Sequence, residues 1–317
     1  MVVTTAVEPL RAVEPAASPA ADEHLYLIGR PTLKQFIRYV RGHAVNPPGE
    51  GDLTDEWQAA NRVVSTLEKD EPGLADAPPM RPLGPEYEPL LIEFLKDPLV
   101  RHGYNTVPTD VALVELDRLV VYQKHIDLTF VRELERKLGP APSDATVFRT
   151  CLAYEHPRPP AKWTRVRRDT FVFVSPSNDL RFLGAMPLEP EHINHPHPGT
   201  LVGAVALAVG FGSNFLNAIY AERRLILHNG SHRAYTLRRL GITHVPCIVQ
   251  HVSTRAELDV VGPPDVAHHA DTYLKQPRPS LLKDYFHPQL HKVMAVHRRQ
   301  HQVTVKFEVD EGFLPAL

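Results

Sequence analysis

Residues 224–250 constrain the fold of this 317-residue chain more than any other stretch. An apolar run stops at Asn229-Gly230, an amphipathic segment follows at once, and a second glycine leads into another apolar run. This order is typical of a strand, a tight corner, a helix and a second strand. We therefore expect strands over 224–228 and 245–249 in one sheet, with a helix over 231–240 between them.

The first turn of the expected helix carries polar side chains that suit an anion. A helix that begins directly after a glycine presents unpaired backbone N–H groups, which favour an anion together with the helix dipole. Gly230 lets the backbone approach a ligand closely, and Arg233 is a forked donor for phosphate or carboxylate. We predict anion binding by Asn229, Gly230, Ser231 and Arg233, with His232 binding the anion or moving a proton. A corner whose polar groups only satisfy the backbone is the alternative.

The composition limits the classes of partner. Hydrophobic residues make up 43% of the chain, which allows a sizeable core, and the formal charge is −2. A nucleic-acid-binding protein usually shows a clear basic excess, so nucleic acid is not the expected partner. The two cysteines, Cys151 and Cys247, are too few for a disulfide framework. No segment approaches the roughly 20 apolar residues of a membrane span, so we expect a cytoplasmic protein with no membrane contact.

Composition and periodicity divide the chain into four parts and predict the α+β class. Residues 1–23 are rich in Ala, Pro and Glu and are expected to be disordered. Residues 24–105 resemble a helical region tied by Pro-rich loops. Residues 106–252 mix strand and helix patterns. Residues 253–317 are expected to form a polar linker, to about residue 280, and a C-terminal strand that completes the sheet or pairs with a second copy as a homodimer.

Several shorter segments carry predictions of their own. Residues 144–156 have the pattern of a strand, and residues 168–186 that of two strands around a turn. Residues 200–224 are apolar and fit either a buried helix or a strand with a loop. The basic run at 162–169 favours a solvated strand edge over nucleic-acid contact. An amphipathic helix is expected over 128–139, with Thr129 as its cap.

Two stretches resemble the ParB/sulfiredoxin-like superfamily. "HNGSHRAYTLRRLGITHVPCIV" (228–249) is similar to the second signature motif, in which Gly-x-x-Arg opens a helix between two strands. "VALVELDRLVVYQKHIDLTFVRELERKLG" (111–139) resembles the first motif, and the two lie in the family's order. The resemblance implies a mixed-sheet domain over 106–252. In relatives the corner holds the phosphates of CTP, ATP or ADP, so such a nucleotide with Mg is a candidate cofactor, and Gly230, His232 and Arg233 are carried over as anion-binding positions.

The chain also departs from that family. Sulfiredoxins have a catalytic cysteine where Ser231 stands here, so sulfiredoxin activity is not expected. Only about 65 residues follow Gln250, and they lack the pattern of the helix-turn-helix domain of partition-type ParB proteins. We therefore expect the fold to be retained and the activity to have changed.

The expected function is that of a bacterial enzyme acting on a small anionic molecule. Acid–base condensation of the Pictet–Spengler type, as in specialised metabolism, and nucleotide-dependent phosphoryl transfer both fit. A ParB-like nucleotide-dependent switch or nucleic-acid-binding protein is the alternative. By resemblance Glu115 approaches the corner as a general base, although it also suits the solvent-facing side of a strand. His102 and Arg81 lie in loops that could cover the pocket, as a second proton-transfer group and a second anion-binding group. Arg233→Ala is expected to weaken binding while folding stays nearly intact.

Three histidines, His192, His195 and His197, invite comparison with a zinc site. They lie among prolines without a cysteine partner, and 18 histidines are spread through the chain. We therefore expect a solvated loop there and no metal centre.

Overall fold

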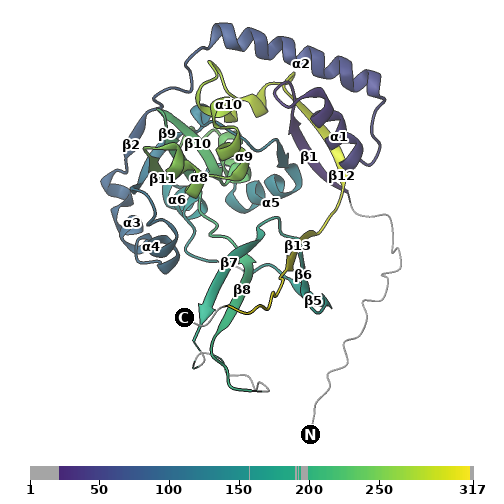
Figure 1. Ribbon diagram of the computed structural model, residues 1–317. Coiled ribbons are helices and arrows are strands. Elements are labelled where there is room, and N and C mark those ends of the chain that lie inside the picture. The colour runs from purple at the N-terminus through teal and green to yellow at the C-terminus, as the bar shows by residue number, and fades with distance from the viewer. Residues whose placement is uncertain (1–20, 157, 190, 192, 194–198, 315–317) are drawn as a thin grey trace.

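The computed structural model describes residues 21–156, 158–189, 191, 193 and 199–314. Its architecture is α+β, as the sequence predicts: helices surround two sheets in a body, and a β-rich extension projects from that body (Figure 1). None of the helices among the described residues combines the length and apolar character that a bilayer span requires. The α-helices are α1 (Leu33–His43), α2 (Glu50–Asp70), α3 (Glu88–Phe94), α4 (Pro98–Gly103), α5 (Leu128–Leu138), α6 (Asp144–Cys151), α7 (Ser231–Arg239), α8 (Arg255–Val261), α9 (Pro264–His268) and α10 (Ala270–Leu274), and the 3₁₀ helices are η1 (Pro85–Tyr87), η2 (Leu116–Arg118) and η4 (Leu282–Phe286).

A five-stranded sheet lies at the centre of the body, with the strand order β10-β9-β11-β3-β2. Its strands are β2 (Met80–Pro82), β3 (Thr109–Glu115), β9 (Asn217–Ala221), β10 (Arg224–Asn229) and β11 (His244–Val252). β11 runs parallel to β9 and antiparallel to β3, while β10 is antiparallel to β9. The predicted strand–helix–strand unit is confirmed as β10, α7 and β11, and both strands belong to this sheet.

A second sheet joins distant parts of the chain. Its order is β12-β1-β4, with β1 (Ala21–Leu27) pairing antiparallel to both β12 (His291–His297) and β4 (His125–Asp127). One hydrophobic cluster includes Phe36 from α1, Leu227 from β10 and Tyr285 from η4, all fully buried. The parts predicted as 24–105, 106–252 and 253–317 therefore share one core.

The extension consists of a three-stranded sheet and a two-stranded ribbon, and we call it the β-extension. The sheet has the order β13-β6-β5, and the ribbon pairs β7 with β8. Its strands are β5 (Lys162–Arg167), β6 (Thr170–Ser175), β7 (Leu180–Leu188), β8 (Ala204–Phe211) and β13 (His301–Lys306). The two strands predicted within 168–186 form as β6 and β7, although they pair with other strands and not with each other. β5 is an edge strand, as its basic sequence predicts, and the C-terminal strand β13 pairs with β6 of its own chain.

Three local predictions are wrong. The segment 144–156 contains helix α6, because Ser143 caps it by accepting from Thr146 N, and Val147, Phe148 and Cys151 bury one helical face. Helix α5 is capped by the Asp127 carboxylate, which accepts from the N–H groups of Thr129 and Phe130, and not by the Thr129 side chain.

The third wrong prediction is that of a linker at 253–280. It holds three short helices, α8, α9 and α10, and α8 begins with a capping box between Thr254 and Glu257. Leu258 and Leu274 from these helices are buried in a second hydrophobic cluster beneath β9 and β10. Of the expected disordered segment, residues 1–20 lie outside the described residues, and residues 21–23 belong to β1.

Candidate functional site

The corner between β10 and α7 has a conformation that requires glycine. Gly230 has φ of 95°, in the left-handed region, and a Cβ there would lie 3.1 Å from the Leu216 side chain and 3.2 Å from Arg233 Nη2. Since Gly230 is also the N-cap, no side chain caps α7. The N–H groups of the first turn are therefore left for an outside acceptor, as expected for an anion-binding helix start.

Arg233 is buried beneath this corner, with only 6% of its surface exposed. Its Nη1 donates to the main-chain oxygens of Thr150, Cys151 and Asn214, at 3.2, 3.3 and 2.5 Å. Its Nη2 is buried and finds no hydrogen-bond partner among the described residues. Burial lowers the pKa of the guanidinium, yet arginine stays protonated in proteins. Arg233 therefore fixes the loop before β9 and keeps one charged donor free in the interior.

Polar side chains from several elements surround the same place. We call the following residues the corner cluster: Tyr104, Arg181, Ser213, Asn217, His228, Asn229 and Arg233. Hydrogen bonds link four of its members, Tyr104, Ser213, Asn217 and Asn229.

Asn217 Nδ2 donates to Tyr104 Oη at 3.2 Å, and Tyr104 Oη lies 3.2 Å from Ser213 Oγ. Asn229 Nδ2 donates to the main-chain oxygen of Ser213 at 3.1 Å. The loop between β8 and β9 is thus held against the corner by side chains. Asn217 Oδ1 is a second buried atom that lacks a partner in the described part of the chain.

Arg181 supplies the solvent-facing cation of the corner cluster. Its side chain is half-exposed and pairs with Asp179. A Cβ on Gly212 would lie 2.5 Å from the Arg181 guanidinium carbon, so this side chain crosses closely over the backbone of the loop. Its charge also contributes to lowering the pKa of His228, which places it near that ring. Arg181 is therefore the group that an anion from solvent would meet first.

Two half-buried histidines flank Gly230. Burial, with a smaller contribution from neighbouring charges, lowers the pKa of both His228 and His232 to about 4. His228 Nδ1 and His232 Nε2 are buried and have no partner among the described atoms. Both rings are therefore neutral near pH 7 and able to accept a proton. The His232 ring packs edge-on against Phe130 of α5 and His125 of β4, whereas His228 lies beside Arg181.

The structure does not bring Glu115 to this corner. Glu115 ends β3 opposite His244, the first residue of β11. Two residues later, Asp117 forms a two-bond ion pair with Arg238 in the last turn of α7. A nine-residue helix is about 13 Å long, so Glu115 lies towards the far end of α7. It is not placed to act as a base on a ligand that Arg233 holds.

Two other predicted site residues do not join Arg233: Arg81 lies apart from it, and His102 makes no contact with it. Arg81 is exposed on β2, which forms the opposite edge of the central sheet from β10. His102 is exposed in the last turn of α4, and it is connected to the corner only through Tyr104, which follows it closely in the chain. The predicted anion-binding residues at the corner itself, Asn229 to Arg233, are brought together by the β10–α7 connection.

Sequence reasoning missed five members of the corner cluster: Tyr104, Arg181, Ser213, Asn217 and His228. His228 directly precedes Asn229-Gly230, so its place at the strand end gave a usable signal. Arg181 reaches the corner only because β7 pairs with β8, where it lies opposite Gly210. A pairing between strands that far apart leaves no local mark in a single sequence.

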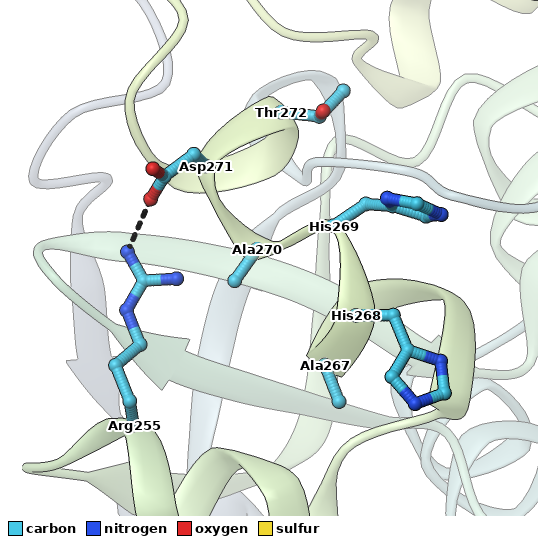
Figure 2. A pocket seen from close by; sticks show the side chains of 7 residues that line it. All are labelled: Arg255, Ala267, His268, His269, Ala270, Asp271 and Thr272. Atoms are coloured by element: carbon cyan, nitrogen blue, oxygen red, sulfur yellow. Dashed lines mark hydrogen bonds and ion pairs between the residues drawn. The ribbon is translucent and has the colours of Figure 1, made fainter.

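Two surface hollows lie away from the corner. One, of about 410 Å³, is lined by residues of α8, α9 and α10, with the Arg255–Asp271 ion pair on one side and His268 and His269 on the other (Figure 2). Arg255 also pairs with Glu222, so its charge is neutralised. The second, of about 280 Å³, lies beside β12.

No grouping of three or more His, Cys, Asp or Glu side chains within the described ranges could hold a metal ion. The histidines at 192, 195 and 197 lie outside those ranges.

Comparisons with known proteins place the chain in no family. No protein-family model, curated protein or solved structure matches it.

Proposed function

We propose that this protein is an enzyme that binds a small anionic molecule at the corner cluster, on a ParB/sulfiredoxin-like scaffold. The observation that carries the proposal is Arg233 Nη2, a buried charged donor without a partner among the described residues, beside an uncapped helix start. An unsatisfied buried polar group costs about 1–3 kcal/mol, and a charged one costs more. An anion held between Arg233 and the first turn of α7 would remove that cost.

The neighbouring groups indicate how such a ligand would enter. Arg181 is exposed and forked, and it can hold a carboxylate or phosphate through two hydrogen bonds when it exchanges Asp179 for the ligand. Asn229 and Ser213 are half-buried, and Asn229 Nδ2 donates to the main-chain oxygen of Ser213. The loop 212–214 must shift to give an anion access to Arg233 Nη2, since that atom is covered. Arg181 is thus the binding group on the surface and Arg233 the one beneath it.

The proton-transfer chemistry of the cluster favours acid–base catalysis. His228 is neutral near pH 7 and offers an unpartnered ring nitrogen that can accept a proton. Burial raises the pKa of Tyr104, so its hydroxyl remains a proton donor. These groups support a condensation or cyclisation of the Pictet–Spengler type. Phosphoryl transfer from ATP, ADP or CTP with Mg is the competing chemistry, and a ParB-like nucleotide switch or nucleic-acid-binding protein is the non-enzymatic alternative.

Thermal denaturation with a ligand panel tests the proposal. The panel contains inorganic phosphate, pyrophosphate, ATP, ADP and CTP with and without Mg, and aromatic amino acids. A ligand at a hundred times its Kd stabilises the folded state by about 2.7 kcal/mol. Stabilisation by carboxylates alone supports acid–base chemistry, and Mg-dependent stabilisation by a nucleotide supports the competing one.

Arg181→Ala separates the corner from non-specific anion binding. We expect it to lower the affinity for the ligand about tenfold to a hundredfold, which corresponds to the loss of a charged hydrogen bond. The Tm of the unliganded protein should not change. Arg136→Ala, which removes an exposed arginine on α5, is the matched control and should change neither the ligand affinity nor the Tm. Equal affinity in wild type and Arg181→Ala, or no stabilising ligand in the panel, contradicts the proposal.

A further inference from the structure

The β-extension exposes an apolar surface that a monomer does not normally leave uncovered. Its exposed large side chains are Trp163, Val166, Phe182, Leu183, Met186 and Val205, with exposed fractions between 47% and 69%. Contacts between β13 and β7 make its two sheets neighbours. Segment 307–314 adds further exposed apolar side chains, Val309, Phe313 and Leu314.

The same region carries a basic open edge. β5 is the edge strand of its sheet, so its outer backbone groups face no further strand in the described structure. Lys162, Arg165 and Arg167 on β5 are exposed and form no ion pair with any described residue. Trp163 lies between two of these cations and is 66% exposed.

An acidic, apolar segment lies at the opposite edge. Residues 307–314 (FEVDEGFL) follow β13, and β6 separates β13 from β5. Glu308, Asp310 and Glu311 are exposed and, like the β5 cations, lack an ion pair within the described ranges. Phe307 and Val309 alternate with Glu308 and Asp310, which is the period of a strand.

We propose that the β-extension is a homodimer interface in which segment 307–314 of each copy pairs with β5 of the other. The segment adds as a strand to the open edge, its carboxylates meet the β5 cations, and the exposed Val309 and Phe313 cover apolar surface around Trp163. A two-fold axis forms this contact twice, because the segment of each copy pairs with β5 of the other. This inference is independent of the proposed function.

A single-stranded nucleic acid is the competing occupant, because aromatic and basic side chains also suit it. The acidic segment on the same extension disfavours a polyanion, whereas it complements a second copy. We therefore assign the surface to self-association, and nucleic-acid binding becomes an outcome of the test.

Charge reversal tests the pairing directly. In the first variant Lys162, Arg165 and Arg167 become Glu, and in the second Glu308, Asp310 and Glu311 become Lys. Sedimentation should show a dimer for wild type and a dimer at least about a hundredfold weaker for each variant alone, because like charges then face each other. An equimolar mixture should recover the dimer, since both contacts in the mixed pair again join opposite charges.

The controls address folding and other partners. Circular dichroism and Tm should match wild type in both variants, because the changed side chains are exposed. Arg136→Glu with Lys137→Glu on α5 should leave the dimer intact. A monomeric wild type, unchanged dimerisation of either variant, or a mixture that stays monomeric overturns the assignment. So does a monomer that binds a single-stranded oligonucleotide and loses that binding when the β5 cations are reversed.

Discussion

Two buried arginines, Arg278 and Arg233, show how equal burial can serve different ends. Arg278 is fully buried and donates to both oxygens of Asp284 at 2.6 Å and to Glu71 at 3.0 and 3.1 Å. Arg233, 6% exposed, forms no ion pair within the described structure and bonds only to main-chain oxygens. Burial lowers the pKa of both, but the two carboxylates more than offset this for Arg278 and raise it.

The difference separates a structural charge from one that is left for a ligand. Arg278 joins the end of α2 to η4, and its charge is neutralised inside the protein. The charge of Arg233 lies beside a helix start that also favours an anion. A protein that buries a cation without a counter-ion carries a cost that a bound anion removes.

Arg278→Ala should have the largest effect on stability. It leaves Asp284 buried without its partner, so we expect a loss of about 3–5 kcal/mol in the free energy of unfolding. Urea denaturation measures this loss. The double change Arg278→Met with Asp284→Leu should recover much of it, because no buried charge remains. Equal losses in the single and double variants would mean that the ion pair is not the cause.

Arg233→Ala should combine a smaller loss of stability with a loss of binding. The burial and the three carbonyl contacts of Arg233 give it a structural role as well, so folding is no longer expected to stay nearly intact. We expect a cost of about 2–4 kcal/mol from the carbonyls left without a donor. Ligand-dependent stabilisation should vanish in this variant and persist in Arg278→Ala at a temperature where both remain folded. Loss of stabilisation in both variants would remove the distinction between the two sites.

Acid should destabilise the protein through its buried imidazoles. The pKa of His125, His228 and His232 is lowered to about 4, chiefly by burial, against 6.5 when unfolded. Their contribution to the free energy of unfolding is complete above pH 6.5. It is lost as the pH falls towards 4, because only the unfolded chain takes up protons between these two pH values. The slope is up to about 1.4 kcal/mol per pH unit for each ring.

The histidine at the corner can be isolated by substitution. His228→Gln should reduce that slope by about one ring's share, measured by urea denaturation between pH 4 and 7. The exposed His102→Gln should leave it unchanged. An identical slope in wild type and His228→Gln would show that His228 is not buried as a neutral group.

Arg181→Lys should give the smallest effect. It keeps the charge but loses the planar fork, so we expect about a fivefold to tenfold loss of ligand affinity and stability within about 0.5 kcal/mol of wild type. Isothermal titration with the best ligand of the panel measures the affinity. A loss as large as that of Arg181→Ala would indicate that two-point contact, and not charge, dominates binding.

The sequence predicted what depends on neighbours in the chain. The β10–α7–β11 unit follows from local periodicity and from Gly230, and the α+β class follows from the same patterns. The predictions that failed concern contacts between residues that are far apart in the sequence. Arg181 and Tyr104 reach the corner through strand pairing and loop packing, which a single sequence does not reveal. Glu115 was placed by family resemblance, whereas β11 extends beyond the end of β10 and carries the end of β3 away from Gly230.

Local patterns also misled where two structures share one signal. Val147, Phe148 and Cys151 form a short apolar group that fits a strand or one face of a helix, and the cap at Ser143 decides for the helix. The segment 253–280 was assigned to a linker because of its polar composition, but short capped helices bury only a few residues each.

The pairing of β1 with β12 also bears on how the protein is made. Ala21 lies opposite His297 in the finished sheet, so strands separated by about 270 residues must meet. During synthesis the first strand leaves the ribosome long before its partner exists, and its apolar residues, among them Leu25 and Leu27, stay uncovered until then. The body can close only after residue 297 has emerged. Until then the first strand stays free only if the nascent chain aggregates slowly or if chaperones cover it.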